Sequence, residues 1–158
     1  MRHKMKEITP VGMLAIALLL FAHLGARDIQ AQAAPSIEEA KRFIGTWRLV
    51  SDVSTGVMIY DNLGNMAVQV MPMRERQKFA GAQPTPDEAK TAITGYLAYF
   101  GTYTVDGPAH TITHHRRGSL NPGQVGEDAV RQYEFAAGNR LVLSPVGTRE
   151  QIIWERAK

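Results

Sequence analysis

The chain of 158 residues contains no cysteine. This absence excludes disulfide bridges, thiolate metal sites and thiol nucleophiles. It also leaves no cysteine to which a lipid could be attached. Packing and hydrogen bonds must therefore stabilise the fold, and a single domain of this length buries enough surface for that.

The sequence also lacks the motifs that mark common enzyme and cofactor sites. It contains no G-x-S-x-G elbow, no glycine-rich phosphate loop, no dinucleotide fingerprint and no paired-carboxylate motif. Ser119 stands in Ser-Leu-Asn-Pro, which is typical of a turn rather than of a nucleophile. We therefore expect no cofactor and no catalytic serine.

Metal-ligand spacing is absent as well. Outside the N-terminal region the histidines are His110, His114 and His115. On one strand His110 and His114 would lie ~13 Å apart, whereas a shared ion needs both nitrogens within ~2.1 Å. His114 and His115 point to opposite faces of a strand. No metal site is expected.

No apolar run reaches the length of an ordinary membrane-spanning helix. The longest, residues 11–26, has about 16 residues, against the ~20 that a span needs. A basic start precedes it and the tripeptide Ala-Gln-Ala at 31–33 follows it, which is typical of a cleaved signal peptide. We expect residues 1–33 to be this signal and residues 34–158 to be the domain, exported to the periplasm or extracellular space without stable membrane insertion. An uncleaved anchor is the alternative.

The basic charge depends largely on that segment. The whole chain carries a formal charge of +3, but residues 1–33 hold four of its 18 basic and two of its 15 acidic residues, which leaves +1 for the rest. A balance so near neutrality is not the electrostatic footprint of a nucleic-acid-binding protein. We expect no nucleic-acid partner.

Turn residues divide the rest of the chain into short elements. A helix is predicted over 36–44, where Ser36 and Glu39 have capping-box spacing, and a second helix follows Thr85-Pro86-Asp87-Glu88, with its apolar side chains buried. Ser54-Thr55-Gly56 is interpreted as a turn. Alternating apolar residues between such turns predict eight strands: 47–53, 57–60, 66–71, 98–105, 111–117, 129–136, 140–144 and 151–156.

Gly45-Thr46-Trp47 after a short helix, and the aromatic stretch Tyr99-Phe100-Gly101-Thr102-Tyr103, resemble the small lipocalin-like domains of the calycin group. The resemblance covers most of residues 43–156. It implies a mainly β fold, an antiparallel barrel of about eight strands with one or two short helices and an interior pocket. A barrel of eight strands has room for its own side chains or for one small ligand.

The resemblance also implies a set of interior residues. Tyr99, Tyr103, His114 and Arg131 are the expected polar groups around a small hydrophobic or amphipathic ligand. Tyr133 and Phe135 share a face of their predicted strand with Arg131, and the two aromatic rings indicate that this face points inward. Both are expected to contact the ligand, Phe135 as part of the apolar wall. Leu141 and Leu143 are expected in the apolar wall. Trp47 and Arg156 are expected to stack at the floor of the barrel as a structural pair.

Three hypotheses for function remain open. The first is binding of a small, largely apolar ligand inside the barrel. The second is an isomerase or cyclase in which His114 and Arg131 move a proton and stabilise an oxyanion. The third is a structural or partner-binding module whose interior is filled by its own side chains. The sequence does not assign a catalytic residue.

Overall fold

The computed structural model describes residues 37–158. The predicted signal peptide and the predicted cap Ser36 lie outside the described residues. The first described element is a helical turn over residues 37–41. It leads directly to Phe43, which is completely buried.

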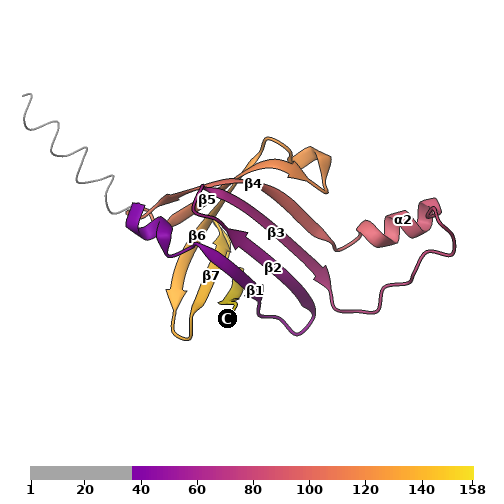
Figure 1. Cartoon of the computed structure of the whole chain (residues 1–158), viewed down its shortest axis with the longest axis horizontal. Coiled ribbons are helices and arrows are strands. Elements are labelled where there is room, and N and C mark those ends of the chain that lie inside the picture. Colours follow the sequence, from indigo (N-terminus) through magenta and orange to yellow (C-terminus); the bar gives the residue numbers. More distant parts are fainter. Residues whose placement is uncertain (1–36) are drawn as a thin grey trace, which may run out of the picture. The chain divides into compact units, whose positions relative to one another are not determined.

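Eight antiparallel strands form a closed barrel, which confirms the predicted fold (Figure 1). Each strand pairs with its neighbour along the chain, and β1 pairs with β8 to complete the ring. The strands are β1 (Gly45–Leu49), β2 (Ser54–Tyr60), β3 (Asn65–Pro72), β4 (Leu97–Asp106), β5 (Thr111–Ser119), β6 (Asp128–Ala136), β7 (Arg140–Pro145) and β8 (Ile152–Arg156). A 3-10 turn, η1 (Pro122–Gln124), lies between β5 and β6.

The turn predicted at Ser54-Thr55-Gly56 is wrong. These residues begin β2, where Thr55 pairs with Met71 and Gly56 with Val70. The chain reverses earlier because the hydroxyl of Ser51 accepts hydrogen bonds from the backbone N–H groups of Val53 and Ser54, at 3.2 and 3.1 Å. β1 accordingly ends at Leu49 rather than at residue 53.

The second predicted helix is α2 (Pro86–Ile93), with the expected capping box between Thr85 and Glu88. The expectation that its apolar side chains are buried is wrong, since no residue of α2 is buried. Ile93, for example, is 55% exposed. Figure 1 shows the reason: α2 belongs to the long connection from β3 to β4, which extends beyond the strand ends. Within the described residues, no helix is long and apolar enough to cross a membrane.

The barrel has two different ends. At the plug end, defined by the helical turn 37–41 and Phe43, aromatic rings meet edge to face. Phe43 contacts Tyr60, Tyr133 and Phe135 at centroid distances of 5.7, 4.9 and 4.9 Å. The loop end, defined by the connections 50–53, 73–96, 120–127 and 146–151, lies opposite.

Inward-facing apolar side chains form the core between these ends. They come from the helical turn region and from all eight strands. The buried members are Phe43, Trp47, Met58, Tyr60, Met66, Val68, Tyr99, Ile112, Tyr133, Leu141, Leu143 and Trp154. Leu141 and Leu143 thus lie in the wall where the sequence placed them.

The structure brings Trp47 and Arg156 together at the plug end. The guanidinium carbon of Arg156 lies 4.2 Å from the centre of the Trp47 ring. The same guanidinium donates to the carbonyl of Ile44 at 2.6 Å and to the carbonyl of Arg42, while Trp47 Nε1 donates to the carbonyl of Phe43 at 2.8 Å. These bonds connect residues 42–44, which follow the helical turn, to β1 and β8.

Replacing Arg156 with glutamine should lower the free energy of unfolding by about 1–3 kcal/mol, because one cation–π contact and two charge-assisted bonds are lost. Urea unfolding measures the change. Arg149→Gln, on an exposed loop, is the matched control and should change stability little. Equal stability of the two variants would show that the plug does not depend on Arg156.

Candidate functional site

His114 is buried inside the barrel, with 1% of its surface exposed. Tyr60 Oη lies 2.7 Å from its Nε2, and Tyr99 Oη lies 2.8 Å from its Nδ1. Three strands, β2, β4 and β5, contribute these side chains. The cluster of Tyr60, His114 and Tyr99 is called the Tyr–His–Tyr cluster below.

This environment keeps the imidazole neutral. Burial lowers the pKa of His114 to about 3, and the positive charges of Arg131 and Arg116 act in the same direction. Burial also raises the pKa of both cluster tyrosines, that of Tyr60 strongly. A general base needs a pKa near the working pH, so the neutral imidazole with both nitrogens engaged is better suited to orienting groups than to taking a proton.

A β-bulge sets the register of the cluster. Pairing between β4 and β5 shifts between Phe100 and Gly101, so that Tyr99 faces Ser119 while Gly101 faces Arg116. A Cβ at Gly101 would lie 1.9 Å from the carbonyl oxygen of His115, a distance that no side chain tolerates. Glycine at this position therefore permits the close approach that directs Tyr99 and Arg116 to the same interior.

Arg131 lies on the inward-facing side of β6. It alternates with the buried residues Ala129 and Tyr133, and it pairs in register with Ile112, which is completely buried. Its positive charge acts on Tyr60, Tyr99 and His114 alike. The structure thus brings Arg131 toward the Tyr–His–Tyr cluster from β6, the strand that pairs with the strand of His114.

The other three predicted ligand-binding residues lie closer to the plug end. Tyr103 donates its hydroxyl to the carbonyl of Asp61 at 3.0 Å, in the turn between β2 and β3. Tyr133 and Phe135 contact each other and Phe43, and a cation–π contact joins Phe135 to Arg42. Their contacts are those of a packed barrel floor.

One of these side chains has an unpaired polar atom. Tyr133 Oη is buried and has no hydrogen-bond partner in the described structure, and the same is true of Trp154 Nε1. Burial, together with the negative charge of Glu39, raises the pKa of Tyr133 to about 12.

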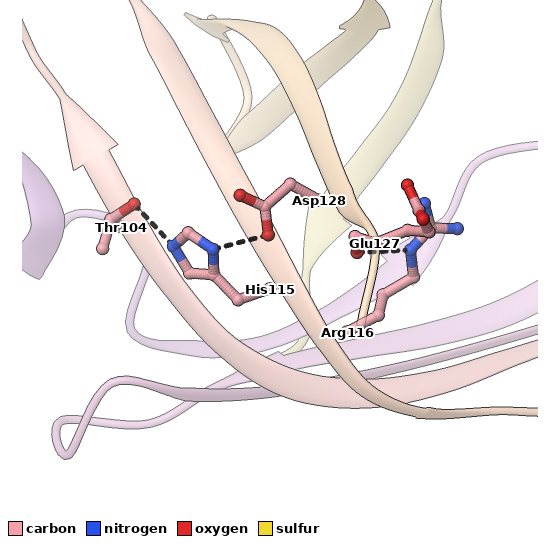
Figure 2. A network of polar contacts seen from close by, with 5 residues as sticks. All are labelled: Thr104, His115, Arg116, Glu127 and Asp128. Atoms are coloured by element: carbon pink, nitrogen blue, oxygen red, sulfur yellow. Dashed lines mark hydrogen bonds and ion pairs between the residues drawn. The ribbon is translucent and has the colours of Figure 1, made fainter. Parts of the chain in front are cut away.

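Thr104, His115 and Asp128, labelled in Figure 2, form a second polar network on the outer face. His115 Nδ1 is 2.7 Å from Asp128 Oδ1, and its Nε2 is 3.0 Å from Thr104 Oγ1. The order of hydroxyl, imidazole and carboxylate is that of a hydrolytic triad. However, Thr104 is exposed on the outer surface of a regular sheet, and the three side chains come from β4, β5 and β6. We interpret them as a link across these strands.

A surface cleft of about 690 Å³ lies between segment 72–79 and α2. Arg74, Arg76, Lys78 and Phe79 contribute to its lining. It contains none of the residues that the sequence predicted for ligand binding.

Sequence reasoning missed Tyr60 as a member of the site. Its partner His114 is 54 positions away, and no local pattern connects them. The available signal was the alternation within β2, where Met58 and Tyr60 share the inward face. That pattern identifies the face but not the contact.

The comparisons with known proteins agree with the fold. A family model described as a lipocalin-like domain matches residues 44–157. The chain therefore belongs to the lipocalin-like domain family. No curated protein matches the chain.

The neutrality of His114 predicts a pH-dependent stability. The unfolded chain takes up a proton near its ordinary pKa of 6.5 while the folded chain resists it down to about 3. The contribution of neutral His114 to the free energy of unfolding is therefore fully present above pH 6.5. It decreases by about 1.4 kcal/mol per pH unit as the pH falls from 6.5 toward 3.

Replacing His114 with glutamine removes that dependence. The difference in unfolding free energy between wild type and the variant should narrow by about 2–3 kcal/mol between pH 7 and about pH 4.5. Urea unfolding at several pH values measures it, and His110→Asn, in a turn that tolerates asparagine, is the control. Parallel pH profiles of wild type and His114→Gln would mean that the imidazole is not held neutral.

Proposed function

We propose that this protein binds a small, largely apolar molecule inside the barrel, with Tyr99 and Arg131 as its polar contacts and His114 as the group that orients Tyr99. The family and the closed eight-stranded barrel support ligand binding in general terms. A barrel of this strand number can enclose one small ligand. The inward-facing side chains around the cluster, such as Val68, Ile112 and Leu143, are apolar and suit an apolar body.

One observation carries the proposal: a buried neutral imidazole and an arginine without an ionic partner face the same interior. Among the described residues, no carboxylate lies within ion-pair distance of Arg131. Arg131 is half-buried and, within the described structure, keeps most of its donors free of protein acceptors, so it can receive an acceptor from a ligand. The low pKa of His114 favours this binding hypothesis over the isomerase or cyclase hypothesis.

Ala129 provides a direct test. It is 5% exposed, faces inward and pairs in register with His114. Ala129→Leu adds three carbon atoms beside the imidazole and should exclude the ligand, lowering occupancy at least about tenfold, at a stability cost of about 1–3 kcal/mol. Native mass spectrometry of protein purified from its own host measures occupancy by a co-purifying molecule.

Val130→Leu is the matched control, because Val130 is the next residue on the same strand and is 40% exposed. It should leave occupancy unchanged. Equal occupancy in both variants would place the ligand outside the barrel. A wild-type protein that carries no molecule, and binds none from a panel of apolar compounds, would support a barrel filled by its own side chains.

We also propose that the protein is exported and acts in the periplasm or extracellular space. The basic start, the apolar run over residues 11–26 and the Ala-Gln-Ala tripeptide support this. The family match begins at residue 44, after this segment.

Cleavage at this site predicts a mature chain that begins at Ala34. Intact mass and N-terminal sequencing of protein from its host test this, with Ala33→Leu as a variant that should block processing. A full-length chain found in the membrane fraction would instead support the uncleaved anchor.

A further inference from the structure

The two hydrogen bonds within the Tyr–His–Tyr cluster leave one of its O–H donors unused. Tyr60 and Tyr99 each carry one O–H, and neutral His114 carries one N–H and one acceptor nitrogen. Both ring nitrogens are engaged, one by each tyrosine. In either tautomer one phenol donates to the ring and the other accepts from it, so the accepting phenol retains a free O–H.

The surrounding charges indicate which phenol is free. Tyr60 lies at the plug end, where its ring contacts Phe43 and Tyr103 at 5.7 and 4.8 Å. Tyr99 lies nearer the loop end, and the positive charges of both Arg131 and Arg116 act on its phenol. An acceptor that reaches the two arginines therefore also meets the hydroxyl of Tyr99. This favours the tautomer in which His114 Nδ1–H donates to Tyr99.

No acidic side chain in the interior balances the two arginines. None of the inward-facing positions of the eight strands is aspartate or glutamate. Within the described residues, neither Arg116 nor Arg131 forms an ion pair. Arg131 has one long hydrogen bond, 3.4 Å to the carbonyl of Val130, and Arg116 Nε donates to the carbonyl of Glu127 at 3.1 Å. Most of their donors remain available.

We propose that the ligand is an apolar carboxylic acid bound as its carboxylate. One oxygen accepts the free O–H of Tyr99, and the other contacts the guanidinium of Arg131, with Arg116 as the second positive charge near the loop end. Two coplanar oxygens match the donor geometry of a guanidinium, and the apolar wall receives the rest of the molecule. This inference rests on the proposed binding function and adds the chemical class of the ligand.

Matched acids and amides of different shape test the class separately from binding itself. Suitable probes are decanoate, naphthalene-2-carboxylate and adamantane-1-carboxylate, each beside its primary amide. Isothermal titration calorimetry at neutral pH compares wild type, Arg131→Gln and Arg117→Gln. Arg117 is exposed on the same strand as Arg116 and makes the control variant equal in charge.

The expected result is an acid that binds at least about tenfold more tightly than its amide in one or more pairs. Arg131→Gln should lower the affinity for the acid by about 10- to 100-fold, as expected for a lost charge-assisted pair. It should leave the affinity for the amide nearly unchanged. Arg117→Gln should have no effect. If Arg131→Gln does not fold, Arg131→Lys replaces it and should give a smaller loss.

The other outcomes are distinguishable. An amide that binds as tightly as its acid would overturn the carboxylate class and leave the binding function intact. Failure of every probe to bind would contradict both proposals. ¹⁵N NMR of the His114 ring gives an independent readout: an Nε2–H tautomer in the complex would overturn the contact with Tyr99.

Discussion

The interior of this barrel depends on an imidazole that is buried but not ionised. Protonated His114 would place a charge in an apolar core beside two arginines, at a cost that no nearby carboxylate offsets. As a neutral ring it accepts one hydrogen bond and donates another, so it links Tyr60 on β2 to Tyr99 on β4 inside the barrel. The two phenols are thereby oriented by a group that stays neutral over the physiological pH range.

The arginines show how the two ends of the barrel differ. At the plug end, the guanidinium of Arg156 is satisfied by the Trp47 ring and by the carbonyls of Arg42 and Ile44. Nearer the loop end, Arg131 has a single long bond to a neighbouring carbonyl. An arginine side chain is thus paired at the plug end, where two carbonyls and an indole ring face it, whereas among the described residues Arg131 has only one carbonyl within hydrogen-bond distance and most of its donors unpaired.

Much of the architecture could be predicted from local patterns. All eight strands were predicted, most of them to within about two residues, because alternation and turn residues act over a few positions. The α2 capping box was equally local. The first turn was misplaced although its cause is local, since the hydroxyl of Ser51 accepts bonds from backbone N–H groups two and three positions later. The burial of α2 depends on distant parts of the chain, and none of its residues is buried because its connection extends beyond the barrel. Tyr60 was missed because its contact with His114 exists only after the barrel closes.

Two neighbouring histidines show how closing the barrel gives adjacent side chains different environments. His114 and His115 differ by one position on β5, yet one lies inside between two phenols and the other outside between a threonine and an aspartate. The outer imidazole lies within ion-pair distance of a carboxylate, whereas the inner one is held neutral by burial. A group held so far from ionisation is poorly suited to proton transfer but well suited to fixing the direction of a phenol. The arrangement therefore favours recognition of an acceptor by preorganised donors, in which the arginines contribute the charge and the tyrosine the direction.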